Sequence, residues 1–285
     1  MAAVDLKGIF PPTAKRHPYG FSGGYTALIK DSFTLPTLLL IGALIQTILT
    51  LILPPRIAII PLILLLGRAL FSTVQNTKSI DQYLSSQGVF SGRLSAQLPK
   101  SSYNPSVSSP YGSKPASEDL VVFHLGARVQ HPLGPLSPQA KEFGEHFSAL
   151  NHELLKEAKK YGCIDLSIWN GDDRESTTSL LGVYYFKNIE GLNRFAVDPM
   201  HRKAWDWFSK FEKAGGKHLG IFHETFEVKK GGYETLYVNM HPTLLGRGAV
   251  SVKNEESGEE EWVRTLVDAG RGYRQMKGQY SRMGR

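Results

Sequence analysis

Cysteine is almost absent from this sequence. The 285 residues include one, Cys163, which excludes an internal disulfide and a metal cluster built on several cysteines. A reducing compartment suits such a chain. The only Asn-x-Ser/Thr triplet, Asn104-Pro105-Ser106, has proline at its centre and is therefore no glycosylation acceptor. These absences favour a main domain that faces the cytosol.

Signatures of several cofactors and of nucleic-acid binding are missing as well. No glycine-rich dinucleotide loop follows a predicted strand, there is no P-loop, and no His-x-Asp/Glu…His spacing indicates an iron triad. The formal net charge of +7 could favour an anionic membrane surface or nucleic acid. Because the basic residues form no block with interleaved aromatics, we expect no nucleic-acid partner.

Charge is absent from a long run near the N-terminus, "LPTLLLIGALIQTILTLIL" at 35–53. About 20 such residues span a bilayer. After Pro54-Pro55-Arg56 a second run, "IAIIPLILLLG" at 57–67, ends at Arg68. We therefore expect a polar segment at 1–34 and a membrane anchor at 35–74, which begins too deep for a cleaved signal peptide. A buried pair of core helices is the soluble alternative, although such helices usually show a polar face.

The anchor allows two arrangements: one span with the second run at the interface, or a helical hairpin. Basic residues flank it on both sides, namely Lys7, Lys15, Arg16 and Lys30 before it and Arg68 and Lys78 after it. This balance favours a hairpin with both ends in the cytosol, and Arg68 would snorkel to the interface. We expect the endoplasmic reticulum membrane as the location, with the globular domain facing the cytosol.

Two polar stretches show no regular period. Residues 85–117 are rich in Ser, Gly, Pro and Tyr, which predicts a linker over residues 75–117. Residues 249–285 are first acidic and then basic, which predicts a solvated tail. Removal of everything up to about Ser117 should therefore leave a soluble, dimeric domain.

The intervening residues 118–248 predict an α+β domain. "LVVFHLGARVQ", "CIDLSIWNG", "SLLGVYYFKN" and "HLGIFHETFEV" are typical of strands, with the turn "DDREST" between the second and third. Helices are predicted after Ser137-Pro138, after Asn188 and from Pro199, and "YETLYVNM" predicts one further strand. The order is that of a ferredoxin-like fold. Its sheet has helices on one face only, so the other face needs a cover, and a second copy in a homodimer is the expected one.

The motifs "YYFKNIEGLNRFAVDPMHRKAWDWFSKF" and "LGIFHETFEVKKGGYETLYVNM", with "VVFHLGARV" before them, resemble a known family. It is the family of the monooxygenase found in the fumagillin biosynthetic cluster, which is related to the antibiotic-biosynthesis monooxygenases. The resemblance covers about residues 118–248. It implies a dimeric α+β barrel, and the preceding apolar segment resembles that of the fungal members.

The resemblance also implies a reaction class. Such enzymes oxygenate natural products, often without an added metal or flavin, so we expect O2 as co-substrate and no required cofactor. The implied substrate is a hydrophobic small molecule from polyketide or terpenoid metabolism, unsaturated or enolic, which is oxidised or oxidatively cleaved. Related barrels bind haem through a histidine. A haem-dependent oxygenase or dehydratase, or a binding protein without catalysis, are therefore the alternatives.

His201 is the first candidate catalytic residue. On the predicted helix a core-facing stripe is formed by Met200, Ala204, Trp207, Phe208 and Phe211. His201 and Trp205 flank this stripe. Near the start of a helix the charged imidazole is disfavoured, so His201 would be neutral and able to act as a base or an iron ligand.

His223 is the second, and it alternates with Glu224 on the predicted strand. In a regular strand the two point to opposite faces. Arg128 shares a strand face with His124 and could hold an acidic group or steady an oxyanion. An ion pair between Glu224 and Arg128 is the structural alternative. We predict His223, His201, Arg128 and Glu224 as catalytic, no metal ligands, and a substrate pocket lined by Trp169, Tyr185, Trp205, Tyr237, Asn239 and His124.

Overall fold

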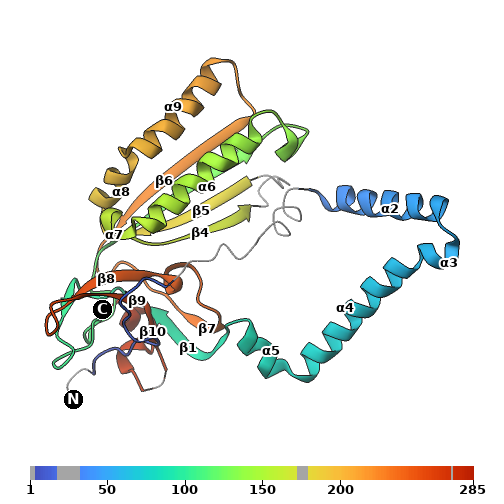
Figure 1. The fold of residues 1–285 in the computed structure, drawn as a ribbon. Coiled ribbons are helices and arrows are strands. Elements are labelled where there is room, and N and C mark those ends of the chain that lie inside the picture. The colour runs from blue at the N-terminus through green and yellow to red at the C-terminus, as the bar shows by residue number, and fades with distance from the viewer. Residues whose placement is uncertain (1–3, 18–32, 172–178, 271) are drawn as a thin grey trace. The chain divides into compact units, whose positions relative to one another are not determined.

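The computed structural model describes residues 4–17, 33–171, 179–270 and 272–285, and the chain forms two compact units. The larger unit combines residues 1–22 with residues 91–285, and the smaller unit is residues 23–90 (Figure 1). The apolar segment is therefore an insertion within a folded body. It is not simply an extension placed before a domain, as the sequence had suggested.

A four-stranded antiparallel sheet is the centre of the larger unit. Its strands are β3 (Leu120–Val129), β4 (Cys163–Gly171), β5 (Ser179–Phe186) and β6 (Leu219–Val228), and their spatial order is β4-β5-β3-β6. Between β3 and β4 lie α6 (Ala140–Lys156) and α7 (Ala158–Tyr161), and between β5 and β6 lie α8 (Ile189–Ala196) and α9 (Pro199–Lys213). The predicted ferredoxin-like order is confirmed. The expected turn at 172–177 falls outside the described residues.

Local signals position these helices. The Asn188 side chain accepts a hydrogen bond from the Gly191 amide at 2.9 Å and caps α8. Asp198 caps α9 by accepting from the Met200 amide at 3.0 Å, and Pro199 occupies the first turn. The helix expected from Ser137 begins later, at α6, after a 3₁₀ turn over Gly134–Leu136.

The helices cover one face of the sheet and bury an apolar core there. Figure 1 shows α6, α8 and α9 on this side. The core joins side chains of α6, α7 and α8 to those of β3, β4 and β5: Val121, Leu154, Ala158, Tyr161, Leu166, Tyr184, Phe186, Leu192 and Phe195. The buried Tyr184 hydroxyl donates to the Asn151 side chain at 2.8 Å, so the polar end of this ring is satisfied.

Two further three-stranded sheets complete the larger unit. One has the order β10-β1-β7 and the other β2-β8-β9. Their strands are β1 (Phe90–Ala96), β2 (Ser102–Tyr103), β7 (Tyr237–Met240), β8 (Ala249–Asn254), β9 (Glu260–Arg264) and β10 (Leu266–Asp268). Short helices η3 (Leu244–Arg247), η4 (Arg274–Met276) and α10 (Gln279–Arg282) accompany them.

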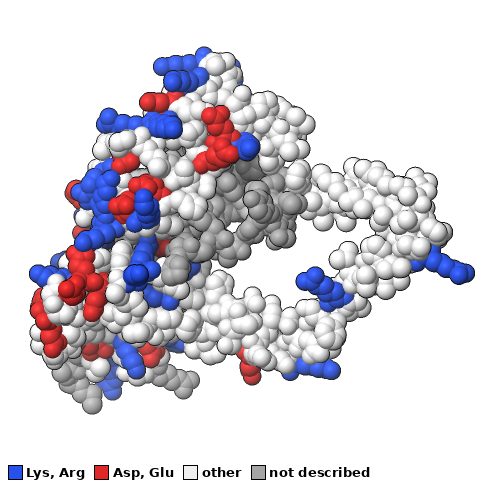
Figure 2. Space-filling view, in the orientation of Figure 1, with Lys and Arg blue, Asp and Glu red and all other residues white. Residues whose placement is uncertain are grey.

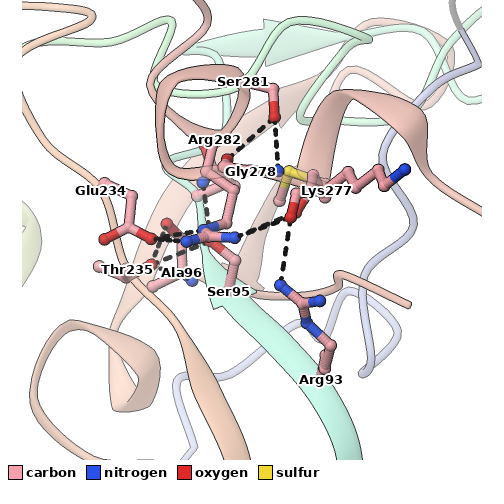
Figure 3. Close-up of polar contacts among 11 residues, drawn as sticks. Arg93, Ser95, Ala96, Glu234, Thr235, Lys277, Gly278, Ser281 and Arg282 are labelled. Carbon is pink, nitrogen blue, oxygen red and sulfur yellow. Dashed lines mark hydrogen bonds and ion pairs between the residues drawn. The ribbon is translucent and has the colours of Figure 1, made fainter. Parts of the chain in front are cut away.

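These elements contradict the linker and the solvated tail expected at 75–117 and 249–285. A second core brings both stretches together with the N-terminal segment: Leu6, Ala96, Leu98, Tyr103, Tyr111, Val250, Val252, Val263 and Val267. The tail is anchored by Arg282, whose buried guanidinium pairs with Glu234 (Figure 3). Beside it the Thr235 hydroxyl accepts from the Ala96 amide at 2.7 Å.

The reason for the error lies in the composition of these short strands. In "AVSVKN" and "EEWVRTLVD" short apolar runs stand between polar and charged residues, and most of the apolar side chains face the core. The composition of each whole stretch is therefore polar, although its strands contribute apolar side chains to the core. Residues 75–78 belong to a helix of the smaller unit, and 80–86 form another.

The smaller unit is helical and apolar. It contains α2 (Leu35–Ile52), α3 (Pro55–Ala58), α4 (Ile60–Lys78) and α5 (Ile80–Ser86). No residue of α2 or α4 is buried, and Figure 2 shows their surface almost free of charged side chains. Two stretches, Leu35–Ile52 and Pro55–Lys78, are long and apolar enough to cross a membrane. An exposed surface of this kind argues against the buried pair of core helices.

Candidate functional site

Continuous pairing of β3 with β6 sorts the predicted site residues onto two faces of the sheet. His223 is paired with Leu125 and Thr225 with Phe123, and paired side chains point to the same face. His223 therefore lies on the helix side. Glu224 is paired with His124, and both lie on the opposite face, here called the open face, as does Arg128. The carboxylate and guanidinium candidates are thus separated from His223.

His201 belongs to the helix side. It lies in the first turn of α9, and its ring centroid is 5.5 Å from that of Phe195 in an edge-to-face contact. Burial lowers the pKa of His201 below its usual 6.5, and the nearby imidazole of His223 lowers it further. A hydrogen bond to the Ala196 backbone and the Asp198 carboxylate oppose this shift. The result is a neutral imidazole at neutral pH, which can accept a proton.

His223 stands on a strand that the helices leave uncovered. Apart from Leu219 the side chains of β6 are exposed or half-buried on both faces, and Ile221, on the helix side, is 36 % exposed. The His223 ring lies 5.8 Å from the Phe123 ring. An accessible imidazole is therefore flanked by apolar and aromatic surface, close enough to His201 to influence its protonation.

Trp205 follows His201 by one helical turn and is 55 % exposed. The predicted stripe on α9 is partly confirmed. Trp207 stacks on Phe211 with ring centroids 6.1 Å apart, and it contacts His146 of α6 at 5.0 Å. Met200, which we expected in the core, is 40 % exposed. Helix α9 therefore packs against α6 through Trp207, whereas Met200 in its first turn is accessible to solvent.

The open face carries a different group of side chains. Nδ1 of His124 lies 3.9 Å from Oε2 of Glu224, so the carboxylate faces His124 and the expected ion pair with Arg128 is wrong. At 65 % exposure of Glu224 this pair is worth little. The Phe222 ring lies flat over Gly126, where an added Cβ would come within 2.0 Å of it. Trp169 is also on this face and is 46 % exposed.

Three predicted substrate contacts serve the second core instead. Tyr185 is on the open face at the end that this core covers, and burial raises its pKa to about 12. The Tyr237 hydroxyl accepts from the Gly246 amide at 2.9 Å. Asn239 has a left-handed backbone (φ 49°), and its Oδ1 accepts from the Gly92 amide at 2.9 Å. These bonds join β7 to η3 and to β1.

Sequence reasoning missed one buried charge, Asp165. Its side chain is fully buried in β4, 3.4 Å from Nε of Arg247. Burial raises the pKa of Asp165 well above its usual value, while Arg16 and Arg264 act in the opposite direction. An aspartate between apolar residues in "CIDLSIW" is the signal that could have revealed it. Its partners come from β4, η3, β9 and the N-terminal segment, so it joins the sheet to the second core.

No group of three or more metal-ligating side chains occurs among the described residues. The helix side of the sheet presents the imidazoles of His201 and His223 together with aromatic surface. One imidazole is neutral and half-buried and the other is exposed. Such a pair can remove a proton from an enol or phenol, and the apolar surroundings suit a hydrophobic substrate.

A family model and a curated relative both match this chain, and both belong to the same monooxygenase family. Residues 120–245 match the family model described as "Monooxygenase af470-like". The chain is 36 % identical over 265 residues to Monooxygenase af470 of Aspergillus fumigatus, covering 93 % of both chains.

Similar solved structures include SnoaB, a cofactor-independent oxygenase from Streptomyces nogalater, at 15 % identity and a TM-score of 0.27 over 38 % of this chain and 91 % of that one. Aldoxime dehydratase OxdRE in complex with butyraldoxime is 18 % identical, with a TM-score of 0.38 over 44 % and 36 %. At this level of similarity neither structure informs the reaction of this chain.

Proposed function

This chain belongs to the af470-like monooxygenase family, and from that premise we propose that it oxygenates an unsaturated or enolic product of secondary metabolism at the helix side of its sheet. A monooxygenase-type oxidoreductase is what the family membership establishes. The observation that carries the proposed site is that two imidazoles lie against aromatic rings on the helix side, half-buried His201 against Phe195 and exposed His223 against Phe123. The open-face residues Arg128 and Glu224 have no part in the proposed chemistry.

The proposed mechanism begins with proton removal. His201, neutral because of its burial, accepts the proton of an enol or phenol, and the exposed imidazole of His223 then passes this proton to solvent. The resulting anion can donate an electron to O2. Conversion of a methylene to a carbonyl takes one oxygen atom, and the other leaves as water. All four electrons come from the substrate, so this reaction needs no external reductant.

The substrate would rest on the aromatic and aliphatic surface around the histidines. Phe123, Ile221 and Trp205 offer apolar contact to a polyketide or terpenoid chain. Burial of such surface is worth about 25 cal/mol per Å². The proposed role of Trp205 is to shield the reacting carbon from water, since its side chain is exposed and one turn from His201.

We also propose a homodimer formed through the open face. Phe222 and Phe226 are 52 % and 47 % exposed there, and Trp169 is 46 % exposed. An apolar patch of this kind on a sheet is unusual for a monomer in water. A second copy of the same face would cover it and close a barrel. Its expected signature is a dimer by light scattering that becomes monomeric in Phe222→Glu.

Membrane attachment through the smaller unit is the third part of the proposal. The exposed apolar surface of α2 and α4 supports it. The cytosolic side of the endoplasmic reticulum is the proposed location of the larger unit, because its thiol is reduced and its glycosylation triplet is blocked. A hydrophobic substrate would reach such an enzyme from the same membrane.

The function is tested by labelling with ¹⁸O2. A host that makes candidate unsaturated precursors is grown with and without the gene, and extracts are compared by mass spectrometry. The proposal predicts a product that depends on the gene and carries one ¹⁸O atom. A product without label, or equal profiles in both cultures across a broad precursor panel, would contradict it.

Haem-dependent chemistry is the second candidate, favoured by the exposed imidazole of His223 on an apolar surface. His223 would be the residue that holds the iron, and the haem would supply activation of O2 or of a substrate oxygen. The protein purified in detergent after expression with added haem decides the matter. A Soret band that is lost in His223→Ala supports haem, and its absence supports the cofactor-independent reaction.

A further inference from the structure

The chain segments before and after the apolar insertion pair with the same short strand. On one edge of β10, Gly8 pairs with Val267, with hydrogen bonds from the Ile9 amide to the Leu266 carbonyl (3.0 Å) and from the Asp268 amide to the Lys7 carbonyl (2.9 Å). On its other edge β1 pairs with β10 from Leu94 to Ala96. A single strand thus separates the entering chain from the returning one, which is about 10 Å.

The N-terminal segment is also built into the core of the larger unit. Leu6 is 1 % exposed, and its amide donates to the Gly112 carbonyl at 2.8 Å. Thr13 pairs with Trp262 of β9. The Arg16 guanidinium donates to the carbonyls of Leu155 at 3.2 Å and Ile164 at 2.7 Å. Residues 4–17 can therefore not be detached from residues 91–285 without loss of this core.

This pairing excludes a single crossing of a bilayer. One span would leave residues 4–17 and residues 91–285 on opposite sides of the membrane, where they could not form one sheet. Given the proposed membrane attachment, the insertion must enter and return on the same side. The sequence had left one span and a hairpin open, and the strand pairing distinguishes them independently of the flanking charges.

The helix lengths allow the hairpin to cross completely. α2 has 18 residues and the stretch Pro55–Lys78 has 24, which at 1.5 Å per residue gives about 27 and 36 Å. The hydrocarbon core is about 30 Å thick. The Gln46 side-chain amide donates to the Ala58 carbonyl at 3.1 Å and links the two arms near the turn. The polar amide of Gln46 is thereby satisfied within the apolar segment.

The turn itself favours the far side of the membrane over its interior. It holds two prolines and a charge, Pro54, Pro55 and Arg56. Irregular backbone and a guanidinium are both poorly tolerated in hydrocarbon. Arg68 lies 12 residues farther along, about 18 Å on, and its long side chain can reach toward the near interface. Mostly polar residues follow from Ser72 onward, and there we place the end of the segment that lies in the hydrocarbon core of the bilayer.

We infer that residues 33–90 form a two-span hairpin whose turn at Pro54–Arg56 faces the compartment opposite to both the N-terminal segment and the larger unit. The lipid bilayer is the partner of its exposed apolar surface. This inference rests on the proposed membrane attachment. Membrane attachment alone leaves the position of the charged turn open, whereas this inference assigns the turn to the compartment on the far side of the membrane.

The test uses single added cysteines in the full chain. Lys7→Cys, Arg56→Cys and Lys213→Cys report on the N-terminal segment, the turn and the larger unit, and all three positions are exposed. The native Cys163 is silent because it is buried, which raises its thiol pKa to about 12. Sealed microsomes are treated with a membrane-impermeant maleimide, before and after permeabilisation by a pore-forming toxin.

The inference predicts that Lys7→Cys and Lys213→Cys are labelled in sealed microsomes, whereas Arg56→Cys is labelled at least tenfold more after permeabilisation. Labelling of all three in sealed microsomes, protection of Arg56→Cys in both conditions, or opposite behaviour of Lys7→Cys and Lys213→Cys would overturn it. Extraction by alkaline carbonate is measured in parallel. Release of the protein would instead overturn membrane attachment itself.

Discussion

At the scale of single residues, the account depends on the protonation of His201. Its pKa lies below 6.5 because the ring is half-buried and His223 is near. The unfolded chain therefore binds a proton more readily than the folded one as the pH falls below 6.5. Stability should decline from that pH down to the folded pKa of His201 and lose nothing more from this group below it.

His223→Gln should raise the pKa of His201, since one of the two causes that lower it is removed. The shifted value should remain below 6.5 because burial, the larger cause, is unchanged. Titration of the imidazole by NMR in wild type and variant measures this directly. Arg202→Gln, an exposed change beside His201, is the matched control. An unchanged His201 titration in His223→Gln would show that the two rings do not interact.

Asp165 gives a second prediction at this scale. Arg247→Met leaves a fully buried carboxylate without its nearest cation, which should cost about 3 kcal/mol in the free energy of unfolding. Burial raises the pKa of Asp165, so the folded state favours the protonated acid. The loss should therefore be small at acid pH and grow as the pH rises through the folded pKa. Urea unfolding at several pH values tests this, and a loss independent of pH would contradict the role given to Asp165.

At the scale of elements, the order of strands and helices in 118–228 could be read from periodicity and capping residues. Asn188 and Pro199 mark helix starts that the structure confirms, and the alternation of His223 with Glu224 correctly predicted opposite faces. The predictions that failed concern side-chain pairs whose members lie far apart in the sequence. Glu224 faces His124 and not Arg128, because the register of β3 and β6 decides the pairing and no local pattern reports it.

The same register places Gly126 of β3 next to the ring of Phe222, an exposed side chain of β6. An added Cβ would lie 2.0 Å from the ring of Phe222, which is exposed and must move aside, so Gly126→Ala should destabilise the protein by about 1 kcal/mol, the low end for overpacking. The smaller side chain in Gly126→Ala/Phe222→Ala should remove the clash and recover part of this loss. Thermal unfolding of the two variants and of Phe222→Ala alone tests the pair. Additive losses would mean that ring and glycine do not meet.

At the scale of the whole molecule, the predictions from sequence were wrong for the segments at both ends of the chain, which belong to the second core. Strands β8 to β10 were predicted as a polar tail because the buried Val250, Val252 and Val263 stand among polar and charged residues. The N-terminal segment was predicted only as polar because its partners, from Gly112 to Val267, lie about 100 to 260 residues away. Composition cannot reveal such pairing, since each strand is short and the partners of β8 and β10 include β2 and β1, which lie far away in the sequence.

Two deletions separate the expected architecture from the observed one. Removal of residues 1–117 should yield an insoluble product, because Leu6, Ala96 and Tyr103 belong to the core. Replacement of residues 24–89 by a Gly/Ser loop of about 20 residues should instead leave a soluble, folded unit, since such a loop spans about 25 Å. Solubility without detergent and cooperative unfolding are the readouts. A folded product from the first deletion would contradict the observed core.

The central claim is that oxygenation takes place on the helix side of the sheet. It is tested most directly by the yield of ¹⁸O-labelled product from cells that express equal amounts of three proteins: wild type, His223→Ala and Glu224→Gln. These neighbours on β6 point to opposite faces. The account predicts that His223→Ala loses at least nine-tenths of the labelled product while Glu224→Gln retains most of it. Full activity of His223→Ala together with loss in Glu224→Gln would place the reaction on the open face.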